Sequence, residues 1–142
     1  MKDCTSVTWE ETSGTATFTI KYKNKEFIGI ATCCDEDKEF QSEIFGCALA
    51  ENRATRKYFA FIRDYEILPE LKSLNQLYYS IKHSSQFNSK SYEAKMLFRQ
   101  IKLREEDLKI VKFAIQDLRN QEIMLKNSLE RTKKYRKNNK PV

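Results

Sequence analysis

Arginine is the residue type in this sequence whose placement best suits binding of an anionic ligand. Arg53 and Arg56 lie in one predicted helical region, and Arg99 and Arg104 lie in another. A guanidinium stays charged at neutral pH and presents a planar fork of N–H donors that matches a phosphate. These four arginines are therefore the candidate ligands for a phosphorylated molecule.

An aromatic ring and an amide stand side by side in the polar segment 83–90. Phe87 is a candidate for stacking on a nucleobase, and Asn88 is a candidate for hydrogen bonding to the edge of that base. The alternative for Phe87 is a hydrophobic plug that closes the end of a pair of helices.

The residues that catalysis usually requires are scarce. His83 is the only histidine, and the sequence contains no Gly-rich phosphate loop, no GxSxG and no HExxH. The cysteines, at positions 4, 33, 34 and 47, match no zinc-binding spacing. We therefore expect a protein that is not an enzyme and that holds no metal or cofactor.

Length and composition favour one domain with long elements. The chain has 142 residues, 3 Gly and 2 Pro, with 32% charged residues and 12% aromatic residues. No apolar run approaches the roughly 20 residues that cross a bilayer, and the N-terminus lacks the apolar segment of a secretory signal. We expect a cytoplasmic protein with reduced thiols.

The first 34 residues are predicted to form an antiparallel β-meander. Strands are expected at 7–10, 15–22 and 27–32, because residues 15–22 alternate between apolar and polar side chains. Lys23-Asn24-Lys25 is a predicted turn, since Asn tolerates the left-handed conformation. Such a small sheet needs a covering layer to be stable.

Two long helical regions are predicted to supply this cover. The first spans 35–83 and begins at Asp35-Glu36-Asp37, with a kink near Pro69; a loop follows over 84–90. The second spans 91–135 and carries a heptad seam that is apolar at eight of ten positions: Leu97, Ile101, Arg104, Leu108, Val111, Ile115, Leu118, Glu122, Leu125 and Leu129. The expected fold is α+β, with the helices forming a hairpin.

A second stripe flanks the seam, formed by Met96, Leu103, Ile110 and Met124. So wide an apolar arc indicates more than one packing partner, and we expect a homo-oligomer, at least a dimer.

The two seam charges have two possible roles: Arg104 and Glu122 pair across the helices and fix their register, or Arg104 binds an anionic ligand.

The C-terminal end carries the net charge. Residues 119–142 contain eight basic and two acidic residues, which accounts for the whole formal charge of +6. Residues 136–142 form a predicted basic tail. This end is either a solvated helix terminus or a nucleic-acid-binding tail.

The segment from Gly29 to Ala54 carries a motif. A strand ends in G-I-A-x-C, an acidic cap and Phe40 follow, and then SE-x-x-G-x-x-x-AE-x-RA. This pattern resembles the first-described Thoeris anti-defence family, phage proteins that sequester cyclic ADP-ribose signals. The order of sheet, helix, loop and helix is similar over most of the chain. Unlike the family pattern, Cys34-Asp35-Glu36-Asp37 contains no proline, and Pro69 interrupts a longer first helix.

The resemblance implies an oligomeric binder that captures a cyclic nucleotide messenger and releases it unaltered. It implies an α+β fold with long C-terminal helices, a second site for cyclic oligonucleotides and a location in the cytoplasm of an infected bacterium. The family's helical arginine falls on Arg53. Its pocket aromatic, asparagine and last-helix arginine have their nearest counterparts in Phe87, Asn88 and Arg104 or Arg99.

Two other functions remain open at this stage. The basic C-terminal end suits a nucleic-acid-binding phage protein. The long helices suit a coiled-coil protein that inhibits a host protein by direct contact.

Overall fold

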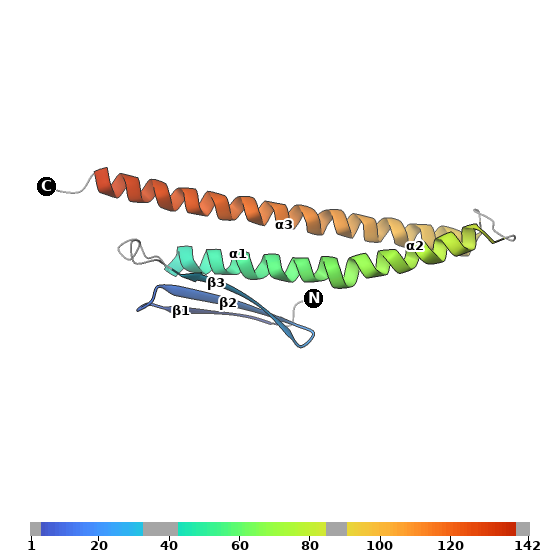
Figure 1. Cartoon of the computed structure of the whole chain (residues 1–142), viewed down its shortest axis with the longest axis horizontal. Coiled ribbons are helices and arrows are strands. Elements are labelled where there is room, and N and C mark those ends of the chain that lie inside the picture. The colour runs from blue at the N-terminus through green and yellow to red at the C-terminus, as the bar shows by residue number, and fades with distance from the viewer. Residues whose placement is uncertain (1–3, 33–42, 85–90, 139–142) are drawn as a thin grey trace. The chain divides into compact units, whose positions relative to one another are not determined.

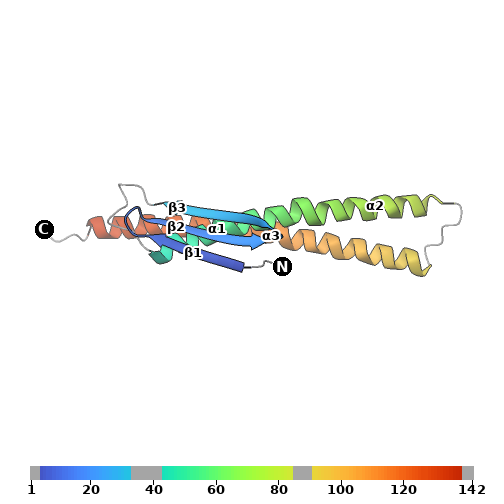
Figure 2. The ribbon, with the colours of Figure 1, turned by 90° about the horizontal axis from the view of Figure 1, so that it is seen from below.

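The computed structural model describes residues 4–32, 43–84 and 91–138 and has an α+β fold. Three strands are followed by helices (Figures 1 and 2). The strands are β1 (Cys4–Glu10), β2 (Thr15–Tyr22) and β3 (Lys25–Thr32). They are followed by α1 (Glu43–Ile62), a π-helical turn η2 (Arg63–Ile67), α2 (Leu68–Lys82) and α3 (Tyr92–Asn138). The predicted α+β class is confirmed.

The sheet is a simple meander in the order β1-β2-β3, and both pairs of neighbouring strands are antiparallel. The predicted turn at Lys23-Asn24 is a two-residue hairpin loop in which both residues have positive φ, 48° and 62°. This conformation matches the right-handed twist of the flanking strands. β3 therefore begins at Lys25, two residues earlier than predicted, and β1 begins at Cys4 rather than at residue 7.

The chain divides into two compact units, which are described separately. The first unit comprises residues 1–58 and 116–142, and the second comprises residues 59–115. The predicted helix start at 35–37 and the predicted loop residues from 85 to 90 lie outside the described residues. In the described part of the chain, no helix is both long and apolar enough to span a membrane.

The first unit is held together by close contact between β3 and α1. Gly29 is buried against the backbone of α1, and a Cβ at this position would overlap the carbonyl oxygen of Ala50 and the amide of Ala54. Small side chains on both elements permit this approach. Beside it, the Tyr58 ring makes edge contacts with the rings of Tyr22 and Phe27, at centroid distances of 5.3 and 5.8 Å.

The buried face of α1 includes several small residues. Gly46, Leu49, Ala50, Ala54 and Tyr58 are buried, among others, whereas Ile44 is exposed. Cys47 packs against the core of Ala16, Ala31, Leu49 and Ala50. Burial, together with the Glu43 carboxylate, raises the pKa of the Cys47 thiol and favours its protonated form.

The second unit has its own apolar core between α2 and the N-terminal half of α3. Ile67, Leu71, Leu97 and Ile101 form its centre. The predicted irregularity near Pro69 appears as the π-helical turn that precedes it, in which the Leu68 N–H donates to the Arg63 carbonyl. Proline cannot donate a backbone hydrogen bond, so the wider turn relieves the crowding that Pro69 would cause in a regular helix.

All ten positions of the heptad seam are buried or half-buried. The seam is therefore the inward face of α3, as predicted. α3 continues to Asn138, three residues beyond the predicted end of the helix, so residues 136–138 of the predicted basic tail are helical.

The contact at Gly29 can be tested directly. Gly29→Ala should lower the free energy of unfolding by about 2–3 kcal/mol, because the added methyl group overlaps the α1 backbone. Urea denaturation measures this loss. Ile30→Val, at an exposed neighbouring side chain, is the control and should change stability by less than about 0.5 kcal/mol. Equal stability of the Gly29→Ala variant and the parent protein would contradict the close packing.

Candidate functional site

The most concentrated group of charged side chains in the first unit surrounds the carboxylate of Glu122. We name Arg53, Arg56, Glu122 and Lys126 the Glu122 cluster. Glu122 Oε1 accepts from Arg53 Nε at 3.1 Å and also from Arg56 Nη2. Its second oxygen, Oε2, lies 3.1 Å from Lys126 Nζ. Two guanidinium groups from α1 therefore converge on a single oxygen atom of α3.

Helical spacing explains how the cluster forms. Arg53 and Arg56 are three residues apart on α1, and Glu122 and Lys126 are four residues apart on α3, so each pair lies on one side of its helix. Glu122 occupies a seam position and its side chain is only 15% exposed. Its pairing with α1 agrees with the first predicted role of the seam charges, which is pairing between helices.

The carboxylate is held in its charged form. Burial acts to raise the pKa of Glu122, but hydrogen bonds from Lys126 and Arg53 and the charges of Arg53 and Arg56 outweigh it, so the pKa of Glu122 is lowered. With Glu122 ionised, the three cations leave the cluster with a net charge of +2.

The two arginines retain binding capacity. Arg53 and Arg56 side chains are 31% and 25% exposed. Arg53 Nη1 also donates to the Ile30 carbonyl at 2.7 Å, and Arg56 Nε donates to Asn52 Oδ1 at 2.9 Å. Because a guanidinium has five N–H donors, these bonds leave donors on both side chains for an additional anion.

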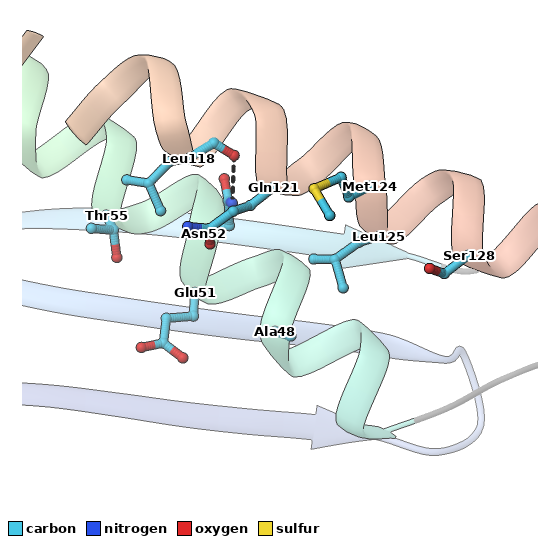
Figure 3. Close-up of a pocket in the computed structure, with 9 residues that line it drawn as sticks. All are labelled: Ala48, Glu51, Asn52, Thr55, Leu118, Gln121, Met124, Leu125 and Ser128. Atoms are coloured by element: carbon cyan, nitrogen blue, oxygen red, sulfur yellow. Dashed lines mark hydrogen bonds between the residues drawn. The ribbon is translucent and has the colours of Figure 1, made fainter. Parts of the chain in front are cut away.

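Asn52 joins the cluster to a groove between α1 and α3. Its side chain is almost fully buried, and its Nδ2 donates to the Leu118 carbonyl at 2.7 Å (Figure 3). Beside it lies a cavity of about 640 Å³, within the usual size range of small-molecule sites, which we name the α1–α3 groove. Its lining residues are Ala48, Glu51, Asn52, Thr55, Leu118, Gln121, Met124, Leu125 and Ser128.

The groove and the cluster differ in their chemistry. The groove combines apolar side chains from Leu118, Met124 and Leu125 with polar groups, and Glu51 is the one charged residue among the described residues that line it. The carboxylate of Glu51 disfavours an anion there. The Glu122 cluster, with its excess of positive charge, is therefore the better anion site of the two.

The remaining predicted ligands are placed differently. In the second unit, Arg104 Nη2 lies 3.0 Å from Asp107 Oδ2 and Arg104 Nη1 lies 3.6 Å from Glu70 Oε2. Two carboxylates thus surround one guanidinium, which leaves a local negative charge. Arg99 is exposed on α3. Phe87 and Asn88 lie outside the described residues.

His83 offers no catalytic arrangement among the described residues. It is exposed, and its ring contacts that of Tyr79 at a centroid distance of 4.2 Å. Within the same residues, no group of three or more His, Cys, Asp or Glu side chains is placed to hold a metal ion.

Lys126, Asn52 and Gln121 were not among the predicted site residues. The spacing of four residues between Glu122 and Lys126 is a signal that identifies Lys126. For Asn52 and Gln121 the sequence carries no comparable signal, because their positions depend on contacts between distant segments.

Comparison of the chain with protein-family models, curated proteins and solved structures finds no match.

The lowered pKa of Glu122 predicts a specific dependence of stability on pH. Because the pKa is lower in the folded chain than the usual value of about 4.3, the stabilisation is present above that pH and is lost as the pH falls through the folded-state pKa. Glu122→Gln should reduce the free energy of unfolding by about 1–2 kcal/mol near pH 7. The difference from the parent protein should shrink near pH 3.

Urea denaturation at the two pH values measures this effect. Glu130→Gln is the matched control, since Glu130 is exposed and pairs with Lys133 on the same helix. A stability difference for Glu122→Gln that stays the same at both pH values would contradict the assigned charge state.

Proposed function

We propose that this chain is a phage-encoded anti-defence protein that binds and sequesters a cyclic ADP-ribose-type immune messenger without hydrolysing it. The place of action in this proposal is the cytoplasm of an infected bacterium. The observation that carries the proposal is the convergence of Arg53 and Arg56 on Glu122. The same arginines lie within or directly after the segment that resembles the Thoeris anti-defence family.

Charge balance supports a pyrophosphate as the bound group. A cyclic ADP-ribose isomer carries two negative charges on its linked phosphates, and the Glu122 cluster carries a net charge of +2. Guanidinium groups bind phosphate oxygens in a bidentate manner. Glu122 holds both guanidinium groups in place before the ligand arrives, which reduces the entropic cost of binding.

Sequestration also suits the chemistry of these residues. Capture requires donors and shape, whereas turnover requires an oriented nucleophile or base. In our proposal the helices form a hairpin that presents the cluster, and the hairpin oligomerises through its helices. The ligand remains intact and returns to solution when the protein unfolds.

Ligand capture is measured by isothermal titration calorimetry with cyclic ADP-ribose isomers. We expect saturable binding, and we expect heat denaturation of the complex to release the unmodified nucleotide, as identified by mass spectrometry. Arg56→Ala should weaken the affinity at least about tenfold, because it removes one charge-assisted contact. Recovery of a changed product would identify an enzyme instead.

Two variants separate binding from folding. Arg63→Ala is the matched control, since Arg63 pairs with its neighbour Asp64 in the second unit and should bind normally. Glu122→Gln raises the cluster charge from +2 to +3 and keeps an amide oxygen that can accept from both arginines, so it should retain or increase affinity while it loses stability. Full affinity in the Arg56→Ala variant would remove the Glu122 cluster from the site.

A specific observation favours a second function, nucleic-acid binding. α3 continues as a helix through the basic C-terminal stretch, where Arg131 and Lys134 are exposed. If this stretch binds a polyanion, the affinity for DNA or RNA should fall steeply with rising salt concentration. Deletion of residues 131–142 should then abolish nucleic-acid binding and leave capture of the small nucleotide unchanged.

Fluorescence anisotropy over a salt series measures this second function. Nucleotide capture that survives the deletion, together with weak nucleic-acid binding by the full chain, would favour sequestration. Nucleic-acid binding that is strong and lost on deletion, without nucleotide capture, would favour the second function.

A further inference from the structure

Asn52 is a buried amide at the contact between α1 and α3. It is only 5% exposed, and among the described residues no other amide or charged residue lies in the buried core. A buried polar group is costly unless its hydrogen bonds are made. An apolar side chain could fill the space between two helices without that cost, so packing alone does not explain an amide at this position.

The two partners of Asn52 fix the orientation of its amide. Asn52 Nδ2 donates to the Leu118 carbonyl at 2.7 Å (Figure 3). Asn52 Oδ1 accepts from Arg56 Nε at 2.9 Å. A backbone carbonyl can only accept and a guanidinium can only donate, so an amide rotated by half a turn would make neither bond.

These bonds close a ring with the Glu122 cluster. In a regular helix the carbonyl of residue 118 accepts the backbone N–H of residue 122, so Asn52 binds α3 at the turn that carries Glu122. Glu122 Oε1 in turn accepts from Arg56 Nη2, and Arg56 lies one helical turn after Asn52 on α1. Each group in the ring therefore restrains the next, and the guanidinium of Arg56 is held at two of its three nitrogens.

The ring leaves one nitrogen of Arg56 available to a ligand. Nε is engaged by Asn52 and Nη2 by Glu122, and none of the described residues accepts a hydrogen bond from Nη1. Arg53 differs, because its second contact is the Ile30 carbonyl in the sheet. Without Asn52, the single contact with Glu122 would orient Arg56, and the guanidinium could rotate about that contact.

We propose that Asn52 is a positioning residue, which orients Arg56 so that Nη1 binds the pyrophosphate of a cyclic ADP-ribose-type ligand. This inference rests on the proposed function and gives a role in it to a residue that does not itself contact the ligand. A guanidinium that is already fixed loses less conformational freedom when the ligand binds. Because Asn52 occupies Nε, the ligand meets only the Nη end of the Arg56 fork.

Removal of the amide tests this role. Asn52→Leu keeps a branched side chain but removes both hydrogen bonds. It should weaken the binding of cyclic ADP-ribose isomers at least about fivefold, because Arg56 must then be ordered as the ligand binds. Isothermal titration calorimetry measures the affinity, and circular dichroism checks that the variant remains folded.

Two further variants keep this test specific. Asn52→Ala removes the same bonds without adding methyl groups to the helix contact, and it should show the same loss of affinity. Thr55→Val is the matched control, since Thr55 lines the α1–α3 groove on the same stretch of α1. It should bind the nucleotide like the parent protein.

A double-mutant cycle separates positioning from a general structural effect. If Asn52 acts through Arg56, then Asn52→Leu should change the affinity of the Arg56→Ala variant by less than about twofold. A purely structural role would instead weaken binding by the same factor whether or not Arg56 is present.

Nuclear magnetic resonance of the free protein provides a readout that does not depend on the ligand. The Arg56 Nε–H signal, assigned by its loss in Arg56→Ala, should exchange with water more slowly in the parent protein than in Asn52→Leu. The control is the Arg63 Nε–H signal, which should be the same in both, because Arg63 Nε donates to Asp64 at 2.8 Å in the second unit.

Three results would each overturn the inference: parent-like affinity in both Asn52 variants, an undiminished loss in the Arg56→Ala background, or an unchanged Arg56 Nε–H signal. The proposed function would stand in each case, since the parent protein would still capture the nucleotide. Failure of the parent protein to bind any cyclic ADP-ribose isomer would instead remove the proposed function, and with it the role of Asn52 in capture.

Discussion

The ionised carboxylate of Glu122 is the constraint on which the arrangement of the first unit depends. Arg53, Arg56 and Lys126 would repel one another if no anion lay between them. A charge pair that is partly removed from water contributes little net stability, because desolvation offsets much of the attraction, but it penalises every arrangement that leaves the charge unpaired. The pairing therefore acts mainly on specificity: it favours the one register of α1 on α3 in which both arginines reach the same carboxylate.

Arg53 extends this constraint to the sheet. β3 is an edge strand in the described sheet, and its outer carbonyl groups would otherwise be open to another strand. Arg53 Nη1 donates to the Ile30 carbonyl, and Lys57 Nζ donates to the Ile28 carbonyl, each at 2.7 Å. Successive carbonyl groups along a strand point to alternate edges, so those of Ile28 and Ile30, two residues apart, face the same edge of β3. Their separation matches that of Arg53 and Lys57, which are four residues apart on α1. The same side chain thus caps a sheet edge and contacts Glu122, so Arg53 links the Glu122 cluster to the packing of β3 against α1.

Local periodicity was sufficient to predict much of the fold. The alternation over residues 15–22 identified β2, and the steps of four and three identified the inward face of α3. The buried face of α1 was harder to predict, since it relies on Ala50 and Ala54, whose small size signals little until Gly29 is placed against them. The two arginine partners of Glu122 are 69 and 66 residues away in the sequence. Periodicity describes one element at a time, so it identified Glu122 as an anomaly on the seam but could not identify which arginines would meet it.

The four predicted arginines show that residue type alone does not determine a binding site. Arg104 is surrounded by two carboxylates, and an incoming phosphate would have to displace Asp107 or Glu70. Arg99 is exposed on α3, where water screens its charge. Arg53 and Arg56 share one carboxylate with Lys126 and retain positive charge in a partly desolvated place. An anion gains most where positive charge is in excess and solvent is partly excluded, so the local charge balance, rather than the number of arginines, is the reason why the proposed ligand site lies in the first unit.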